Sequence, residues 1–72
     1  MAIEYLKVTY PRRREVLAND VPVGDTNVPL LLPADVYTIT LAGEQDYTPA
    51  SVDVVLGETT KQKPRVVAFA PR

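Results

Sequence analysis

The chain has 72 residues, contains no cysteine, histidine or tryptophan, and carries a formal net charge of −1. This length predicts a single small domain over residues 1–72, in which folding buries about 60 % of the surface of the unfolded chain. Without cysteine and histidine the chain cannot build a zinc finger, a thiol nucleophile, a Ser-His-Asp triad or a haem site. We therefore expect no enzymatic activity, no metal centre and no cofactor.

The near-zero net charge conceals a strong segregation of charge along the sequence. Residues 1–14 carry a net charge of +3, residues 15–58 carry −8 without one lysine or arginine, and residues 59–72 carry +4. If the two basic ends meet in the folded protein, its surface is dipolar. Such a surface selects partners of opposite charge.

The sequence shows no apolar segment that would target it to a membrane. Charged side chains interrupt residues 1–20, so no signal peptide is visible. The longest uninterrupted apolar stretch, residues 28–34, is far shorter than the roughly 20 residues that span a bilayer. We therefore expect no transmembrane segment. We also expect the chain to be either a small cytoplasmic protein or a module of a longer chain.

Proline and β-branched residues determine the predicted class of secondary structure. Seven prolines divide the chain into short pieces, and none of these repeats apolar residues with the helical period over three turns. Eleven valines, seven threonines and two isoleucines suit pleated, half-buried strands. The chain is therefore predicted to be all-β.

The first predicted strand, residues 4–10, alternates apolar and polar side chains. Its buried face comprises Leu6, Val8 and Tyr10. A polar corner follows at residues 12–14. Residues 15–18 and 21–23 are predicted to form a hairpin that turns at Asn19-Asp20, because Asn and Asp tolerate the positive φ of a two-residue turn.

A polar turn at residues 24–27 precedes a predicted strand at residues 28–32. Its inward residues are predicted to be Val28, Leu30 and Leu32. Pro29 lacks a backbone N–H and places this strand near a sheet edge.

Residues 36–41 give the clearest alternation in the chain, and a loop then leads to Tyr47. Two further strands are predicted at residues 51–56 and 65–70, separated by a polar segment. Their inward residues are predicted to be Val52, Val54, Leu56, Val67 and Phe69. Six to seven short strands without room for crossover helices predict a small antiparallel β-sandwich and not a parallel sheet.

Several of these segments resemble the PEGA domain, a small bacterial and archaeal β-sandwich similar to carboxypeptidase regulatory-like and transthyretin-like modules. The resemblance covers about three quarters of the chain: residues 16–34 (VLANDVPVGDTNVPLLLPA), 36–41 (VYTITL), 46–49 (DYTP) and 57–60 (GETT). The resemblance implies a prokaryotic, non-catalytic accessory or interaction module, because the family has no shared active site.

The chain departs from the PEGA pattern at four places. Asn19-Asp20 replaces the Asp-Gly of the hairpin, Asp35 replaces the glycine of the signature turn, and Asp46 replaces the glycine before Tyr47. These three changes preserve the backbone geometry, because Asn and Asp are the non-glycine residues that best tolerate positive φ. The fourth, extra residues in the Thr-Pro step at 27–29, leaves the register of the next strand open.

Two groups of polar residues suggest chemistry that turn structure explains equally well. Asp25-Thr26-Asn27 is similar to the Asp-Thr-Gly of aspartic proteases, but Asn27 replaces the required glycine. Oxygen atoms of the kind that Ca²⁺ binds are carried by Asn19, Asp20, Asp25 and Asn27. Their spacing is not that of an EF-hand, so we interpret both groups as turn residues that cap backbone amides.

The candidate interaction residues form two basic clusters, Arg12-Arg13-Arg14 and Lys61-Lys63-Arg65. Nucleic-acid binding usually adds stacking aromatics or a basic domain, and only Tyr10 lies beside either cluster. We therefore predict no nucleic-acid partner. The clusters are either a docking surface for a protein or solvated charges that discourage pairing of strand edges.

Two tyrosines of the second half of the chain are singled out for different reasons. Tyr37, on the clearest strand, is predicted to lie in the core with its hydroxyl bonded to a partner. Tyr47, beside Pro49, either shields one end of the sandwich or is exposed as a binding handle, and we favour packing.

The sequence therefore predicts a non-catalytic protein-interaction or structural accessory module. It would bind a protein partner or another copy of itself through charge-complementary surfaces and an open sheet edge, and salt would weaken the association. The alternative is a carbohydrate-binding or cell-surface-binding module. That function requires exposed aromatic platforms, for which the candidates are Tyr5, Tyr10 and Tyr47.

Overall fold

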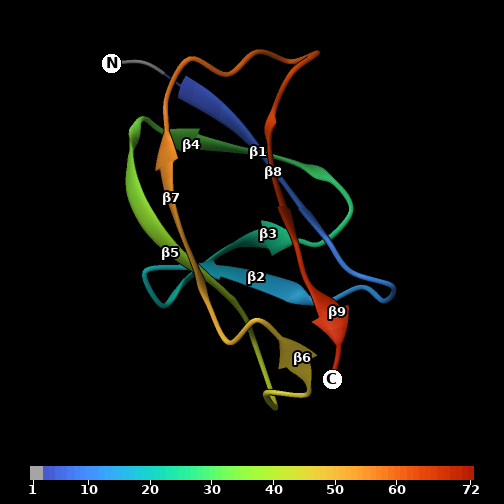
Figure 1. The fold of residues 1–72 in the computed structure, drawn as a ribbon. Coiled ribbons are helices and arrows are strands. Elements are labelled where there is room, and N and C mark those ends of the chain that lie inside the picture. The colour runs from blue at the N-terminus through green and yellow to red at the C-terminus, as the bar shows by residue number, and fades with distance from the viewer. Residues whose placement is uncertain (1–2) are drawn as a thin grey trace.

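A computed structural model describes residues 3–72, which form nine β-strands and no helix (Figure 1). The strands are β1 (Ile3–Thr9), β2 (Glu15–Ala18), β3 (Val21–Asp25), β4 (Pro29–Pro33), β5 (Asp35–Leu41), β6 (Tyr47–Thr48), β7 (Val52–Leu56), β8 (Arg65–Ala68) and β9 (Ala70–Pro71). The all-β prediction is confirmed. Within residues 3–72, no helix is long and apolar enough to cross a bilayer.

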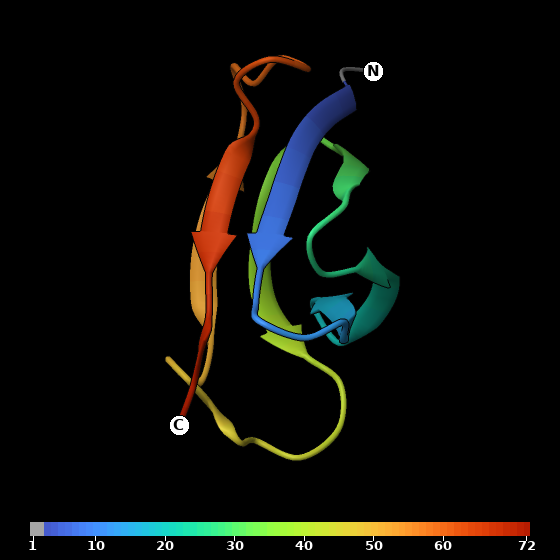
Figure 2. The same ribbon diagram turned by 90° about the vertical axis from the view of Figure 1, so that its right-hand side faces the viewer.

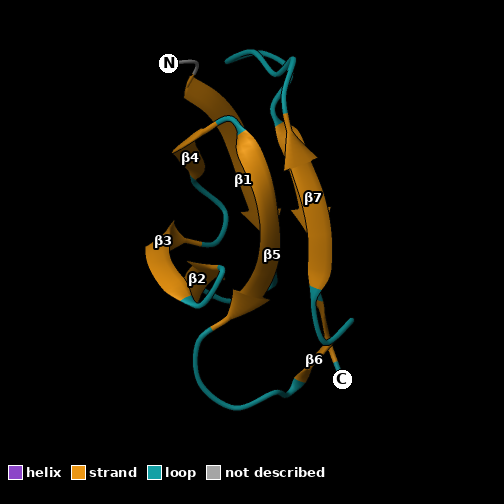
Figure 3. Cartoon of the chain, turned by 90° about the vertical axis from the view of Figure 1, so that its left-hand side faces the viewer, coloured by secondary structure: helices purple, strands orange, loops and turns teal. Residues whose placement is uncertain are grey.

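Two sheets pack face to face as a β-sandwich (Figure 2). One sheet has the order β4-β1-β8, and the other has the order β3-β2-β5-β7. β7 and β8 thus lie on one side of the sandwich, and β3 and β4 on the other. A short ladder of β6 and β9 lies at the end of the molecule near the C-terminus (Figure 3).

Alternation along the strands builds the core between the two sheets. In β1, β4 and β7 every second side chain faces the opposite sheet and is buried, as the period-2 pattern predicts. The buried apolar residues are Leu6, Val8, Tyr10, Val16, Ala18, Leu30, Leu32, Ile39, Leu41, Tyr47, Val54, Leu56, Val67 and Phe69. Tyr37 is only partly buried, so it packs against this core and does not lie within it, while its hydroxyl has the predicted partner, donating to the carbonyl of Pro33 at 2.7 Å.

The hairpin between β2 and β3 forms at the predicted position. Asn19 and Asp20 both have positive φ, 51° and 65°, which is the backbone that a two-residue hairpin turn requires. The Asn19 side chain also accepts the backbone N–H of Thr38 at 2.9 Å. The turn is therefore held against β5 as well as closed on itself.

The region between β3 and β4 differs from the prediction in two details. β3 continues to Asp25, so the turn is limited to the residues after it, and Asn27 has a φ of 65°. Val28, predicted to face inward, is 44 % exposed, because β4 begins only at Pro29 and the alternation starts with Leu30. β4 does form a sheet edge, as Pro29 predicts.

One strand pairing is parallel, which the sequence-based prediction of an antiparallel sandwich did not include. β1 pairs with β8 in parallel, with Val8 opposite Val67, whereas the other five pairings are antiparallel. The chain leaves β7 in one sheet, crosses through residues 57–64, and enters β8 in the other sheet. This crossing brings β8 beside the first strand in the same direction, so no hairpin is involved.

Candidate functional site

The Arg12–Arg14 corner after β1 is held by one buried threonine. The Thr26 hydroxyl donates to the carbonyl of Arg12 at 2.8 Å and accepts the backbone N–H of Arg14 at 2.9 Å. The Thr26 N–H donates in turn to the carbonyl of Arg14 at 2.8 Å. The corner is therefore a fixed part of the fold, and it directs the three arginine side chains to different surroundings.

Arg14 binds the loop that follows β5. Its guanidinium donates to the carbonyl of Ala42 through Nε and Nη2, to the carbonyl of Glu44 at 2.9 Å, and to the Asp46 carboxylate at 2.7 Å. Only 19 % of the Arg14 side chain is exposed. The planar fork of five donors suits this role, because a lysine could not reach three acceptors in one plane.

Two buried aromatic rings support the same guanidinium. Its central carbon lies 5.8 Å from the ring centre of Tyr10 and 5.6 Å from that of Tyr47, within cation–π range. The Tyr47 ring also packs edge-to-face on Phe69, with 5.3 Å between ring centres. The Tyr47 hydroxyl accepts the N–H of Leu41 at 3.2 Å and donates to its carbonyl at 3.1 Å.

These contacts correct the prediction for two of the candidate interaction residues, Tyr47 and Arg14. Tyr47 is only 4 % exposed, so it packs at one end of the sandwich, as favoured, and offers no handle to a partner. Arg14 is engaged with residues of its own chain and is not a free surface charge.

The ion pair between Arg14 and Asp46 shifts the pKa of both partners. The hydrogen bond from Arg14 lowers the pKa of the Asp46 carboxyl below its ordinary value. The same hydrogen bond raises the pKa of Arg14. Both shifts favour the charged forms, so the loop is held most firmly when both groups are ionised.

The neighbouring Asp25-Thr26-Asn27 segment serves the corner as a turn. Asp25 pairs with the exposed Arg13 at 2.8 Å. The Asn27 side chain accepts the N–H of Tyr10 at 3.1 Å and donates to its carbonyl at 2.7 Å. Backbone capping is confirmed for Asn27, whereas Asp25 binds a side chain and Thr26 caps the backbone in its place. The Asn19-Asp20 turn lies at the other end of the β2–β3 hairpin from Asp25.

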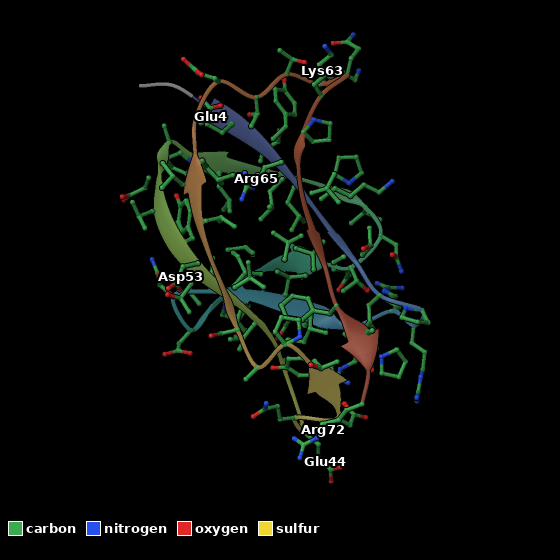
Figure 4. All side chains as sticks on the ribbon, in the orientation of Figure 1. Glu4, Glu44, Asp53, Lys63, Arg65 and Arg72 are labelled. Atoms are coloured by element: carbon green, nitrogen blue, oxygen red, sulfur yellow. The ribbon has the colours of Figure 1, made fainter. Side chains whose placement is uncertain are left out.

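The second basic cluster lies at the opposite end of the molecule. Lys61 and Lys63 belong to the loop between β7 and β8, which is closed by mutual backbone hydrogen bonds of Thr60 and Lys63. Figure 4 shows Lys63 at one end of the sandwich and Arg72 at the other. The arginine corner follows the end of β1, whereas the lysine loop precedes β8, which runs beside β1 in the same direction, so the two clusters do not form one surface.

The lysines of this loop and Arg65, which begins β8, are exposed and form no ion pair within residues 3–72. Arg13 and Arg14, in contrast, each bind an aspartate of the acidic middle segment. Within residues 3–72, all three charges of the cluster Lys61, Lys63 and Arg65 are free of ion pairs, whereas in the other cluster only Arg12 is.

Sheet edges are the other surface feature that could bind a partner. On the β3–β4 side, Pro22, Gly24, Pro29 and Pro33 lie within the strands, and a bulge interrupts β3 beside Val16. Proline lacks a donor and bulges disturb the ladder, so this side resists the addition of a strand. On the other side, β7 and β8 contain neither proline nor glycine.

Exposed valines lie on the outer faces of these two unprotected strands. Val55 of β7 is 69 % exposed and Val66 of β8 is 55 % exposed. We did not single out either residue from the sequence, although the pattern contained the signal. Val54 and Leu56 of β7 and Val67 of β8 face the core, so the valine next to each of them in the strand must face solvent.

The structure also tests the tyrosine platform on which the carbohydrate alternative depends. Tyr10 and Tyr47 lie in the core, and Tyr5 is half-buried. The part of the chain that the structure describes contains no pocket and no cluster of three acidic side chains that could hold a metal ion.

Comparison of the chain with models of protein families, with curated proteins and with solved structures finds no match.

Proposed function

We propose that this protein is a non-catalytic interaction module, built as a PEGA-like β-sandwich, that binds protein partners on the side formed by β7 and β8. The observation that carries this proposal is the contrast between the two sides of the sandwich. One side has prolines, a glycine and a bulge, whereas the strands of the other side lack all three. Natural sheets usually protect exposed edges, so an unprotected pair of edges supports a role in strand addition.

Charge gives this side its selectivity. Lys61, Lys63 and Arg65 lead into β8 and are not neutralised by ion pairs within residues 3–72. An acidic segment would be attracted to this end of the edge, with the charges setting orientation and association rate more than affinity. Binding should therefore weaken as salt rises, because added ions screen exposed charges.

A protein partner is favoured over a carbohydrate because of where the aromatic side chains lie. Sugar-binding surfaces use exposed aromatic rings, and two of the three candidate tyrosines are buried in the core. We therefore propose protein binding alone.

Affinity capture from cells that express the protein tests this function with a matched pair of charge reversals. Lys63→Glu changes the free cluster beside β8, and Arg12→Glu makes the same charge change at the opposite end. Both residues are exposed, so both variants should fold, which thermal unfolding checks. We expect Lys63→Glu to lower the amount of captured partner several-fold and Arg12→Glu to leave it unchanged. Equal capture by the two variants, or no captured protein at low salt, would contradict the proposal.

A further inference from the structure

The outer edge of β7 has the properties of a strand that pairs with another strand. β7, Val52–Leu56, has the sequence VDVVL and ends the four-stranded sheet. Its five residues include no proline and no lysine, two residues that commonly protect an edge. On its outer face Val55 stands directly opposite Val36 of β5, and these two valines are 69 % and 57 % exposed.

The single charge of β7 is held on the side away from the free edge. The Thr38 hydroxyl of β5 donates to the Asp53 carboxylate at 2.8 Å, and Thr38 stands directly opposite Asp53 in the ladder. This hydrogen bond draws the carboxylate toward β5. Asp53 therefore protects the edge less than a free charge would.

We propose that β7 pairs in antiparallel fashion with β7 of a second copy of this chain, so that the two four-stranded sheets join across a two-fold axis. This inference rests on the proposed function in that it uses the same unprotected side of the sandwich. It goes further by naming the strand, the partner and the register.

Hydrogen-bond geometry limits the registers that such a pair can adopt. Alternate residues of an edge strand direct their N–H and C=O groups outward, and in antiparallel pairs such residues stand opposite one another. Two identical strands therefore place odd-numbered residues opposite odd-numbered ones, and even opposite even. Near the middle of β7, the two-fold axis can pass only level with Asp53, Val54 or Val55.

Side-chain chemistry selects among these three axes. An axis at Asp53 places two carboxylates directly opposite each other, which is destabilising. An axis at Val54 places each Asp53 opposite a valine of the other copy. An axis at Val55 places Val55 opposite Val55 of the second copy, Val54 opposite Leu56, and Asp53 opposite Gly57.

The structure thus favours the axis at Val55, because this register gives a continuous apolar row on the outer face of the joined sheet. The row contains Val36 and Val55 of one copy followed by Val55 and Val36 of the other. β-branched pairs on one face stabilise a sheet, and no like charges face each other in this register. A single short strand buries little surface, so we expect a weak dimer whose population rises with concentration.

Cysteine cross-linking tests both the interface and the register, because the natural chain contains no cysteine. Val55→Cys places two thiols directly opposite each other. Opposite residues of antiparallel strands have Cα atoms about 4.5–5.5 Å apart, within the range of about 4.4–6.8 Å that a disulfide spans. We expect mild oxidation of the folded protein to give several-fold more disulfide-linked dimer than the control Val21→Cys, whose thiol lies on the opposite side of the sandwich.

Asp53→Cys is the control for register. In the proposed pair, the two residues 53 lie four positions out of register, which is about 13 Å along the strand, too far for a disulfide. We expect little cross-linking for this variant. Cross-linking of Asp53→Cys as strong as that of Val55→Cys would overturn the register.

Sedimentation velocity of the unmodified chain gives a second readout that does not depend on cysteine. We expect the sedimentation coefficient to rise with protein concentration, and the rise to be lost in Val55→Lys and kept in Val21→Lys. A monomer at every concentration, or a dimer that Val55→Lys does not weaken, would overturn the proposal. Either result would leave the capture experiment above unaffected, because that experiment measures binding to other proteins through the cluster beside β8.

Discussion

The role of Arg14 in the structure differs from the role that its position in the sequence suggests. It stands in a run of three arginines, yet it differs from its neighbours in that it is mostly buried and binds two backbone carbonyls and a carboxylate. The two carbonyls, of Ala42 and Glu44, belong to a loop without regular structure. Arg14 supplies the donors that this loop's backbone needs.

We expect Arg14→Ala to lower the free energy of unfolding by about 1.5–3 kcal/mol, the range for hydrogen bonds to a charged group. Arg14→Lys should restore only part of this loss, because an ammonium cannot reproduce the planar fork. Arg12→Ala is the matched control, since Arg12 is exposed, and should change stability by no more than about 0.5 kcal/mol. Urea denaturation of the three variants measures these differences. Equal stability of the two alanine variants would contradict the role given to Arg14.

The two tyrosines around Arg14 should respond in opposite ways to loss of their hydroxyl groups. The Tyr10 hydroxyl is buried and has no hydrogen-bond partner within residues 3–72, whereas the Tyr47 hydroxyl is bonded to both backbone groups of Leu41. Tyr10→Phe should therefore leave stability unchanged or raise it by up to about 1 kcal/mol, because a buried polar group without a partner is removed. Tyr47→Phe should cost about 1–3 kcal/mol, because two buried backbone groups lose their partner. Urea denaturation of both variants measures these changes in stability. A larger loss of stability for Tyr10→Phe than for Tyr47→Phe would show that the Tyr10 hydroxyl has a partner.

Among the elements, the loop between β7 and β8 is attached to β1 by a carboxylate. Glu4 Oε1 accepts the backbone N–H of Thr59 at 2.9 Å and its hydroxyl at 2.6 Å, while the hydroxyl oxygen accepts the N–H of Tyr5 at 2.7 Å. The side-chain hydrogen bond from Thr59, followed by the bond from its N–H, lowers the pKa of Glu4 below its ordinary value of 4.5. This bond connects the basic loop to the first strand.

Acid should therefore weaken this attachment. A carboxyl whose pKa is lower in the folded state stabilises the fold fully above its unfolded pKa, and this stabilisation is lost as pH falls through the lowered folded pKa. We expect the free energy of unfolding to decrease as pH falls below about 4.5. The decrease should be smaller in Glu4→Gln, whose side chain does not titrate. Urea denaturation of both proteins at several pH values measures this, and identical pH profiles would contradict the role of Glu4.

The β2–β3 hairpin should be sensitive at Asn19 and tolerant at Asp20. Both have positive φ, but only the Asn19 side chain binds β5, through the N–H of Thr38. Asn19→Ala should cost about 1–3 kcal/mol, because it combines the strain of positive φ with the loss of this bond. Asp20→Gly should not destabilise, because glycine adopts positive φ without strain. Thermal unfolding of the two variants tests the difference, and equal melting temperatures would contradict it.

At the scale of the whole molecule, folding mixes charges that are segregated in the sequence. Asp25 and Asp46 of the acidic middle pair with Arg13 and Arg14 of the basic N-terminal segment, while Lys63 lies at the other end of the sandwich. The two basic ends of the sequence meet where β1 pairs with β8, with Leu6 opposite Arg65, but the arginine corner and the lysine-bearing loop do not. Their separation follows from β1, which runs the length of the sandwich between the loop that carries Lys63 and the arginine corner.

Much of the fold could be predicted because it depends on neighbouring residues. The alternation of Leu6 and Val8 in β1, and of Val54 and Leu56 in β7, identifies buried faces, since successive side chains of a strand point to opposite sides. The turn at Asn19-Asp20 could be predicted because positive φ is a local property of those residue types. Less of the candidate site could be predicted: the cluster of Lys61, Lys63 and Arg65 was identified, but not which sheet edges are open.

The sequence by itself therefore determined the all-β class, most strands and most of the core, because these follow from residue type and spacing over a few positions. Only the tertiary structure decided that β8 lies parallel to β1, that Arg14 binds the loop after β5, and that β7 and β8 form the unprotected side. Each of these facts depends on which distant segments meet. The path of the whole chain between the two sheets decides which segments meet, and no local sequence pattern predicts that path.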